Sequence, residues 1–295
     1  MVAELINPSM NPSLVALDRA SSHQLSVRIG LDRNHQSFVQ RQYATYPFRL
    51  SRALRLDPTD PHRTYLYIMN SSPGLLAGDV FQISVRLLDR TALYLTDQSA
   101  TKVHQMAADY CARIHYEVEI GSGASLEYAP EPIILYRDAN LKQTMRVTLA
   151  PTGSLFLSDM MVPGRLARGE CFHFHHYINR LNVYTPDGNL IFADAMQLKG
   201  NGQQHLSPLF ASQPILASII LVLPDGDLHT LSLELEQFAQ TQTDVMVASS
   251  LLPNCNGFLV RVMASNVPIA KAYINHALTK MRQLNGQPAL PEVPK

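Results

Sequence analysis

The chain has 295 residues, of which 46% are hydrophobic, and its 24 basic residues balance its 24 acidic ones. A chain of this length can bury most of its apolar surface without a disulfide or a metal staple. The balanced charge leaves no basic excess to neutralise phosphates, so nucleic-acid binding is not expected. Charged residues make up only 16% of the chain, against about 25% in typical globular proteins, which hints at a surface that a partner covers.

The cysteines and the apolar segments indicate a cytoplasmic protein. Cys111, Cys171 and Cys255 are odd in number and form no C-x-x-C pair, which is typical of a reducing compartment. Residues 1–20 show no signal-peptide pattern. The longest apolar run, Ile215 to Leu223, is too short to span a bilayer. We therefore expect no membrane partner.

The first two thirds of the chain favour strands. Residues 1–22 are polar and turn-prone and predict a flexible N-terminal tail. Short segments that alternate apolar and polar residues then follow, which is the signal of half-buried strands. They cover residues 23–29, 64–68, 80–87, 92–95, 112–120, 125–128, 144–149, 171–175, 180–184 and 190–192. This pattern predicts an all-β region without a fixed-period repeat.

The last third changes character. Residues 215–223 fit a buried strand, and residues 231–239 fit either a short helix or a strand. Residues 245–249 and 257–263 predict a hairpin. A helix is predicted from Val267 to Leu284, capped by Asn266, with Pro268 in its first turn. We expect one β-rich domain over residues 23–287 and a frayed C-terminal tail over residues 288–295.

No enzyme signature is present. The sequence contains no G-x-x-x-x-G-K-[ST], G-x-G-x-x-G, H-E-x-x-H or G-x-S-x-G motif. This shifts the expectation from catalysis toward binding or assembly.

One segment carries possible metal ligands. On a strand, Cys171, His173 and His175 would share a face, and side chains two residues apart lie about 7 Å from each other. Imidazole and thiolate both bind nickel or zinc. The alternative interpretation is a strand with surface histidines whose Phe172 and Phe174 point into the core.

Four motifs carry a resemblance to a known family. Residues 70–79 (NSSPGLLAGD) resemble its P-P-G-G-x-V-G-G-D motif, and residues 95–102 (LTDQSATK) resemble L-T-x-x-x-A-[ST]-K. Residues 126–133 (LEYAPEPI) resemble L-E-x-L-P-[EQ]-x-x-I, and residues 161–170 (MVPGRLARGE) resemble L-G-R-x-A-x-G-E. The motifs follow in the family's order, and the likeness covers about residues 23–285. The chain therefore resembles the UreD (UreH) family of urease accessory proteins.

The resemblance implies both a fold and a role. The fold would be mainly β, a helix-like coil of many short strands with two α-helices near the C-terminus. The role would be that of a non-catalytic scaffold that binds apo-urease and the UreF–UreG complex and assists nickel insertion into the urease active site. No tightly bound cofactor is implied, only transient Ni²⁺. The GTPase of this system is UreG, which agrees with the missing P-loop here.

The resemblance also suggests site residues. Candidates for a nickel path, by motif position, are Asp79, Thr101, Asp159 and Asp194. Oxygen ligands of this kind would hold Ni²⁺ weakly enough to release it. For each acid the alternative is a buried carboxylate satisfied by backbone N–H groups, or, for Asp79, a turn former. Expected roles in fold maintenance or partner contact fall to Gly78, Lys102, Glu131, Gly164, Arg165 and Glu170, with Arg165 and Glu170 as a surface ion pair.

Two other functions stay open at this point. A β-helical enzyme acting on polysaccharide would need paired carboxylates about 5–10 Å apart, for which Glu127 with Glu131 or Asp138 with Asp159 could serve. The absence of Trp makes a sugar-binding groove less favoured. The other alternative is a stand-alone nickel- or zinc-binding protein built on Cys171, His173 and His175.

Overall fold

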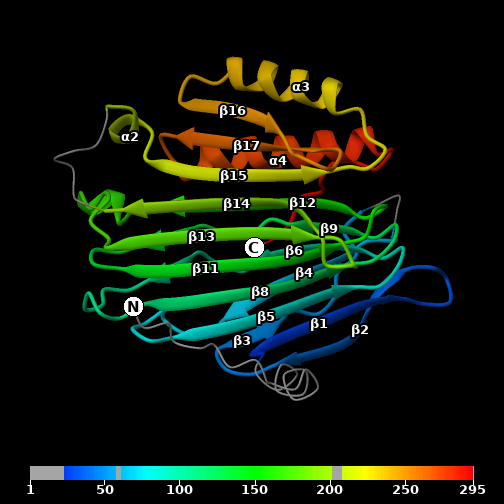
Figure 1. Cartoon of the computed structure of the whole chain (residues 1–295), viewed down its shortest axis with the longest axis horizontal. Helices are drawn as coiled ribbons and strands as arrows, with labels where there is room; N and C mark the ends of the chain where they lie inside the picture. The colour runs from blue at the N-terminus through cyan, green and yellow to red at the C-terminus, as the bar shows by residue number, and fades with distance from the viewer. Residues whose placement is uncertain (1–22, 58–60, 201–207, 295) are drawn as a thin grey trace, which may run out of the picture.

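The computed structural model describes residues 23–57, 61–200 and 208–294. Two large β-sheets lie face to face, and a smaller layer with two long helices covers the outer side of one sheet near the C-terminus (Figure 1). This confirms the predicted mainly β architecture with two helices near the C-terminus. The predicted N-terminal tail falls outside the described residues.

The first sheet has seven strands in the order β14-β13-β11-β8-β5-β1-β2. Their bounds are β1 Leu25–Leu31, β2 Ser37–Ala44, β5 Val80–Leu87, β8 Ala112–Ile120, β11 Asn140–Leu149, β13 His176–Tyr184 and β14 Leu190–Lys199.

The second sheet has ten strands, eight of them in the order β16-β17-β15-β12-β9-β6-β4-β3, with β10 and β7 beside this row. Their bounds are β3 Phe48–Leu50, β4 Thr64–Asn70, β6 Ala92–Asp97, β7 Thr101–Val103, β9 Ser125–Tyr128, β10 Ile133–Leu135, β12 Ser154–Val162, β15 Ile215–Val222, β16 Val245–Leu251 and β17 Gly257–Ala264.

The central part of the chain winds as a coil between the two sheets. From β4 to β13, the main strands alternate between the sheets, and neighbours within each sheet are parallel. Antiparallel pairs close the ends, for example β1 with β2 and β13 with β14. Because side chains of a strand alternate between its two faces, every coil turns one set of residues into the space between the sheets.

Two hydrophobic clusters hold the layers together. One fills the space between the sheets, and the other lies between the ten-stranded sheet and the helices. Strand β15 serves both, since Leu216, Ile220 and Val222 face the first cluster whereas Ile219 and Leu221 face the second. All eight of its residues are buried, which explains its uninterrupted apolar sequence.

A capping side chain precedes each of the two long helices, Asp227 before α3 and Asn266 before α4. Helix α4 spans Val267–Leu284. The Asn266 side chain accepts a hydrogen bond from the Ile269 amide at 3.0 Å, and Pro268 stands in the first turn, as predicted. Helix α3, Leu228–Gln240, resolves the ambiguous segment 231–239 as helix, because its buried residues Leu231 and Leu235 lie four positions apart. Two short helices complete the described part, η2 Leu166–Arg168 and α2 Pro208–Ser212.

Two expectations are corrected. Residues 171–175 do not form a strand, because Phe172 takes a φ of +54° that extended backbone cannot adopt; β13 begins only at His176. The segment 288–294 has no helix or strand, but it is not frayed. Leu290 and Val293 pack against the helix-side cluster, and the Pro294 carbonyl accepts a hydrogen bond from the Tyr67 hydroxyl.

Candidate functional site

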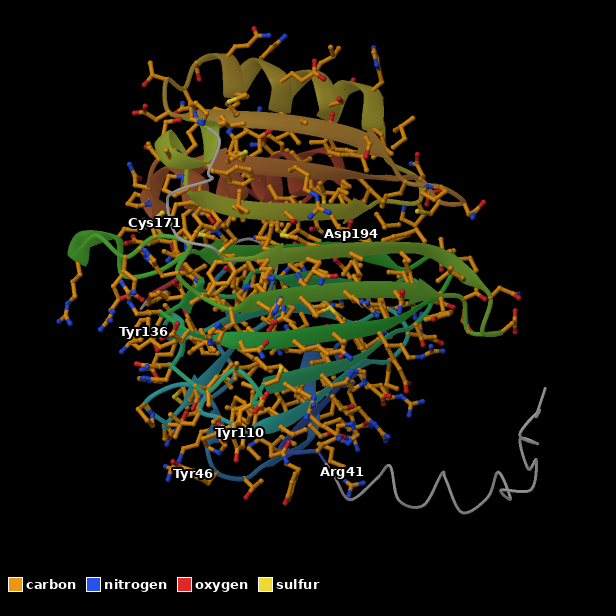
Figure 2. All side chains as sticks on the ribbon, turned by 60° about the vertical axis from the view of Figure 1, so that its left-hand side comes forward. Arg41, Tyr46, Tyr110, Tyr136, Cys171 and Asp194 are labelled. Carbon is orange, nitrogen blue, oxygen red and sulfur yellow. The ribbon has the colours of Figure 1, made fainter. Side chains whose placement is uncertain are left out.

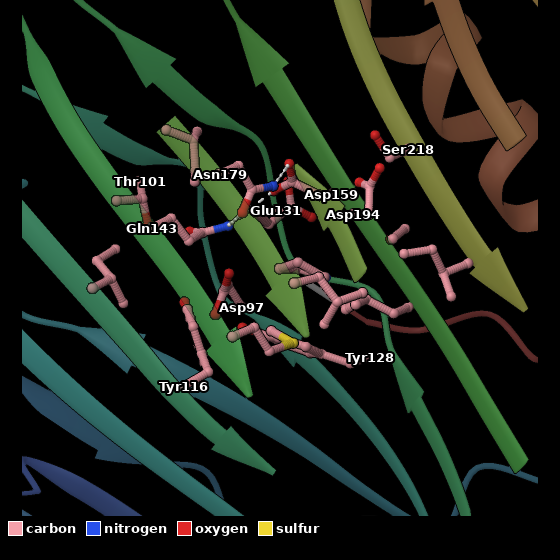
Figure 3. A pocket seen from close by; sticks show the side chains of 18 residues that line it. Asp97, Thr101, Tyr116, Tyr128, Glu131, Gln143, Asp159, Asn179, Asp194 and Ser218 are labelled. Atoms are coloured by element: carbon pink, nitrogen blue, oxygen red, sulfur yellow. Dashed lines mark hydrogen bonds between the residues drawn. The ribbon is translucent and has the colours of Figure 1, made fainter. Parts of the chain in front are cut away.

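A layer of polar side chains interrupts the apolar core between the sheets (Figure 3). The seven-stranded sheet contributes Tyr116 of β8, Gln143 of β11, Asn179 of β13 and Asp194 of β14. The ten-stranded sheet contributes Asp97 of β6, Tyr128 of β9, Asp159 of β12 and Ser218 of β15. Eight strands of the two sheets therefore contribute polar side chains to one layer, and the register pairs Gln143 with Asn179 and Asp159 with Ser218.

These side chains surround an interior cavity of about 50 Å³. That is room for a small number of waters or a hydrated ion's inner ligands. Three of the four predicted path residues, Thr101, Asp159 and Asp194, line it, and so does Glu131. A smaller neighbouring cavity shares Asp97, Thr101 and Tyr116 with it, so the polar space continues toward the β3–β4 side of the sandwich.

Asp159 is the acid of the cavity with the most side-chain donors around it. Its carboxylate accepts hydrogen bonds from the Asn179 amide at 2.7 Å, the Tyr177 hydroxyl at 3.0 Å and the Gln143 amide at 3.3 Å. Burial raises the pKa of Asp159 above its ordinary value, although these three donors oppose that shift. The alternative of satisfaction by backbone N–H groups does not apply, since side chains provide these bonds.

Asp194 of β14 also lines the cavity, and Figure 2 labels its position in the molecule. Its Oδ1 is 2.5 Å from Nη2 of Arg261 on β17, and the same guanidinium donates to the Ser218 hydroxyl. The Asp194 side chain is 20% exposed and that of Arg261 33% exposed. This ion pair therefore links the edge strand β14 of the seven-stranded sheet to β17 of the ten-stranded sheet.

Glu131 lines the cavity from the segment between β9 and β10. It is buried, and its carboxylate pairs with the ammonium of Lys271 on α4. Glu131, Pro130 and Ser158 line the cavity and also an outer groove of about 580 Å³. That groove lies between the ten-stranded sheet, helix α4 and residues 290–293.

Asp79 lies apart from the cavity. It ends a turn in which its Oδ2 accepts a hydrogen bond from the Leu76 amide at 2.7 Å, and Gly78 provides the φ of +81° that favours glycine. The segment also pairs with the second motif, because the Leu75 amide donates to the carbonyl of Lys102. Asp79 thus has the geometry of a turn former.

The fourth motif forms a self-bonded bend. Gly164 has a φ of +149°, and a Cβ there would lie 2.3 Å from the carbonyl oxygen of Glu170. Arg165 binds the Glu170 carboxylate at 2.6 Å, while that carboxylate also accepts from the Arg137 amide. The predicted ion pair exists, but Glu170 is only 5% exposed, so it is half-buried rather than a surface pair.

The possible metal ligands of the predicted strand do not converge. Cys171 is buried, Nδ1 of His173 accepts from the Cys171 amide, and His175 lies 4.0 Å from Asp138. Among the residues that the structure describes, no three His, Cys, Asp or Glu side chains are grouped to hold a metal ion. The bend at Phe172 replaces the shared strand face that the hypothesis required.

Sequence reasoning missed a buried ion network beneath α4. Arg282, 2% exposed, donates from Nε to Glu127 of β9 at 2.9 Å and from Nη1 to Asp57 at 3.2 Å. Arg63 approaches the same Glu127 at 3.2 Å. Burial alone would lower the pKa of Arg282, but the Glu127 carboxylate raises it above its ordinary value. Glu127 is thus fixed in a structural pair and is unavailable as a catalytic acid.

Fold and site together define a class of protein: a stacked coil of strands whose interior carries an acidic, polar cavity beside a helical C-terminal layer. The chain matches the family described as UreD urease accessory protein over residues 22–295, and it belongs to that family. Among the described residues, no helix is long and apolar enough to cross a membrane.

Relatives agree with this assignment. The chain is 42% identical to the urease accessory protein UreD of Trichodesmium erythraeum, over 93% of this chain and all of the relative. It is 34% identical to UreD of Haloarcula marismortui, over 80% of this chain and 78% of the relative. Identity to the urease accessory protein UreD 2 of Streptomyces griseus is 31%, over 87% of this chain and 88% of the relative.

Proposed function

We propose that this chain is a non-catalytic cytoplasmic scaffold of urease maturation. It binds apo-urease and the UreF–UreG complex and lets Ni²⁺ pass through its interior cavity toward the urease active site. Family membership supports the role in urease maturation. The observation that carries the nickel passage is the cavity between the sheets, which is lined by the acids Asp159, Asp194 and Glu131.

The chemistry of the cavity suits transient passage. Its polar lining consists of carboxylates, hydroxyls and amides, which bind Ni²⁺ less tightly than imidazole or thiolate do. A conduit needs binding that is favourable enough to admit the ion and weak enough to release it. Asp159 lines this cavity, and its neutral hydrogen-bond donors leave its charge uncompensated by a direct ion pair.

The scaffold role is tested by co-purification. Tagged chain is expressed with and without the UreF and UreG proteins of the same organism and analysed by size-exclusion chromatography. We expect a ternary complex, because a chain with only 16% charged residues leaves surface for partners to cover. A well-behaved monomer that binds neither protein would contradict the proposal.

The nickel passage is tested by neutralising the acids. Asp159→Asn and Asp194→Asn should leave the complex assembled but lower urease activation at limiting nickel by roughly tenfold, since a lost ligand weakens metal binding by about that factor. Glu119→Gln is the control, because Glu119 pairs with Arg86 on the outer face of the seven-stranded sheet, the face that points away from the cavity. Normal activation by both cavity variants would exclude this route.

A further inference from the structure

Glu131 and Lys271 form an ion pair in the wall between the interior cavity and the outer groove. Glu131 lines both the cavity and the groove. Lys271 lines only the groove, and its ammonium lies on Oε2 of Glu131. The carboxylate is 8% exposed and the lysine side chain 36% exposed. A cation that leaves the cavity on this side therefore meets a carboxylate that already holds a cation.

Two further acids of the cavity, Asp159 and Asp194, are held differently. Asp159 is held by neutral amides and a hydroxyl. Asp194 is held by Arg261, whose planar guanidinium also binds Ser218 and is fixed by both contacts. A lysine ammonium is instead a point charge on a flexible four-carbon stem, so it can leave and return without moving the backbone. Of Arg261 and Lys271, Lys271 is therefore the cation that can leave its carboxylate and be replaced there by another cation.

The helix that carries Lys271 is itself held in place. Arg282, near the other end of α4, is locked into the buried network with Glu127 and Asp57. Lys280 on the same helix pairs with Glu234 of α3 at 2.5 Å. Movement at the wall is thus confined to the Lys271 side chain, while α4 stays seated on the sheet.

We propose that Lys271 is a positioning residue that acts as the resident counter-ion of Glu131, closing the wall between cavity and groove and giving way when a divalent cation passes. This inference rests on the proposed nickel passage. An ammonium and Ni²⁺ repel each other at one carboxylate, so the lysine prevents Glu131 from trapping the ion. The groove beneath α4 is then the side from which Ni²⁺ is handed on or received.

The proposal predicts a gain of metal binding when the ammonium is removed. Full-length chain is dialysed against NiCl₂ to measure its Ni²⁺ affinity. Lys271→Met should raise that affinity about tenfold or more, because an opposite charge within about 4–6 Å shifts a carboxylate's cation affinity by at least that factor. Lys271→Arg keeps the charge and should match the unchanged chain. The double variant Lys271→Met with Glu131→Gln should lose the gain.

Lys280→Met is the matched control. It removes a lysine ion pair from the same helix, and Lys280 lines neither the cavity nor the groove. Its Ni²⁺ affinity should stay unchanged. Lys271→Met should also slow urease activation at limiting nickel, because the ion is retained at Glu131. Circular dichroism verifies folding of each variant, and Lys271→Gln replaces Lys271→Met if the latter does not fold.

The outcomes separate this inference from the proposed function. A folded Lys271→Met chain with unchanged Ni²⁺ affinity overturns the counter-ion role, even if Asp159→Asn impairs activation and the passage stands. A gain that persists in the double variant overturns it too, since Glu131 would not be the ligand. If Asp159→Asn and Asp194→Asn both activate urease normally, the nickel passage fails by itself, whatever the affinity of Lys271→Met.

Discussion

Asp159 is a carboxylate enclosed by neutral donors, and this makes it sensitive to pH. Tyr177, Asn179 and Gln143 all donate to it, and burial is the dominant effect on its pKa, which is raised. A buried carboxylate without a directly bonded cation favours its protonated form in the folded state. The charge that would suit a passing cation is thus held at a cost in stability.

That cost predicts a pH dependence of folding. Because the folded-state pKa of Asp159 lies above the unfolded value near 3.8, the native state binds more protons between the two values. Its contribution to stability is therefore fully present below the unfolded pKa and is lost as pH rises through the folded pKa. In Asp159→Asn this decline should be absent. Urea denaturation of both proteins from pH 4 to pH 8 measures it.

Glu119→Gln is again the comparison, because Glu119 is 55% exposed and does not line the cavity. Equal slopes for Asp159→Asn and the unchanged chain would mean that Asp159 stays ionised in the folded protein throughout this range.

The sequence could name some of these residues and not others. Thr101, Asp159 and Asp194 follow from motif positions, and the structure places all three on one cavity. Gln143 and Asn179 were missed, although each is a polar residue at an inward position of an alternating strand, because the predicted strands began after them. Asp79 also belongs to a motif, but its carboxylate stabilises a turn by accepting from the Leu76 amide and does not line the cavity.

At the scale of elements, helix α4 depends on a single buried arginine. Arg282 lies on the same side of the helix as Leu278, four residues earlier, and both are buried. A charged residue at the buried spacing of an amphipathic helix is the signal that could have revealed it. Its partners could not be read from the chain, since Asp57 and Glu127 come from a distant segment and from β9.

We predict that Arg282→Met destabilises the protein by about 3–5 kcal/mol, because it leaves the buried carboxylates of Glu127 and Asp57 without their main cation. Lys280→Met, which removes a partly exposed pair on the same helix, should cost less than about 1 kcal/mol. Urea unfolding followed by circular dichroism measures both. Similar losses for the two variants would show that the network contributes no more than a surface pair.

The elements that could be predicted differ from those that could not in their burial. The cap and the apolar spacing predicted helix α4, and alternation predicted strands such as β5 and β8. Strand β12 was missed because eight of its nine residues are buried on two covered faces, which removes the alternation. The segment at Phe172 alternates but bends, since long-range packing of Phe172 and Phe174 overrides the local pattern.

At the scale of the whole molecule, the arrangement of strands was beyond periodicity alone. Alternation shows that a strand has an inner face, but it does not show which sheet the strand joins. The resemblance to UreD supplied the coil, and the register places Gln143 of β11 beside Asn179 of β13 and Asp159 of β12 beside Ser218 of β15. The cavity is therefore a property of stacking, since no single segment contains it.

The shared strand β15 predicts that both layers unfold together. Leu126 belongs to the cluster between the sheets and Leu278 to the cluster under the helices, and β15 packs into both. Leu126→Ala and Leu278→Ala should each cost about 2–5 kcal/mol and shift one common transition.

Tyrosine fluorescence, which is available because the chain has 12 Tyr and no Trp, is compared with circular dichroism during urea unfolding. Coincident midpoints in both variants are the expected result, because neither layer can keep β15 buried after the other has gone. If Leu278→Ala instead separates an early transition from a late one, the helical layer unfolds by itself and α4 holds the cavity wall less firmly than its buried network implies.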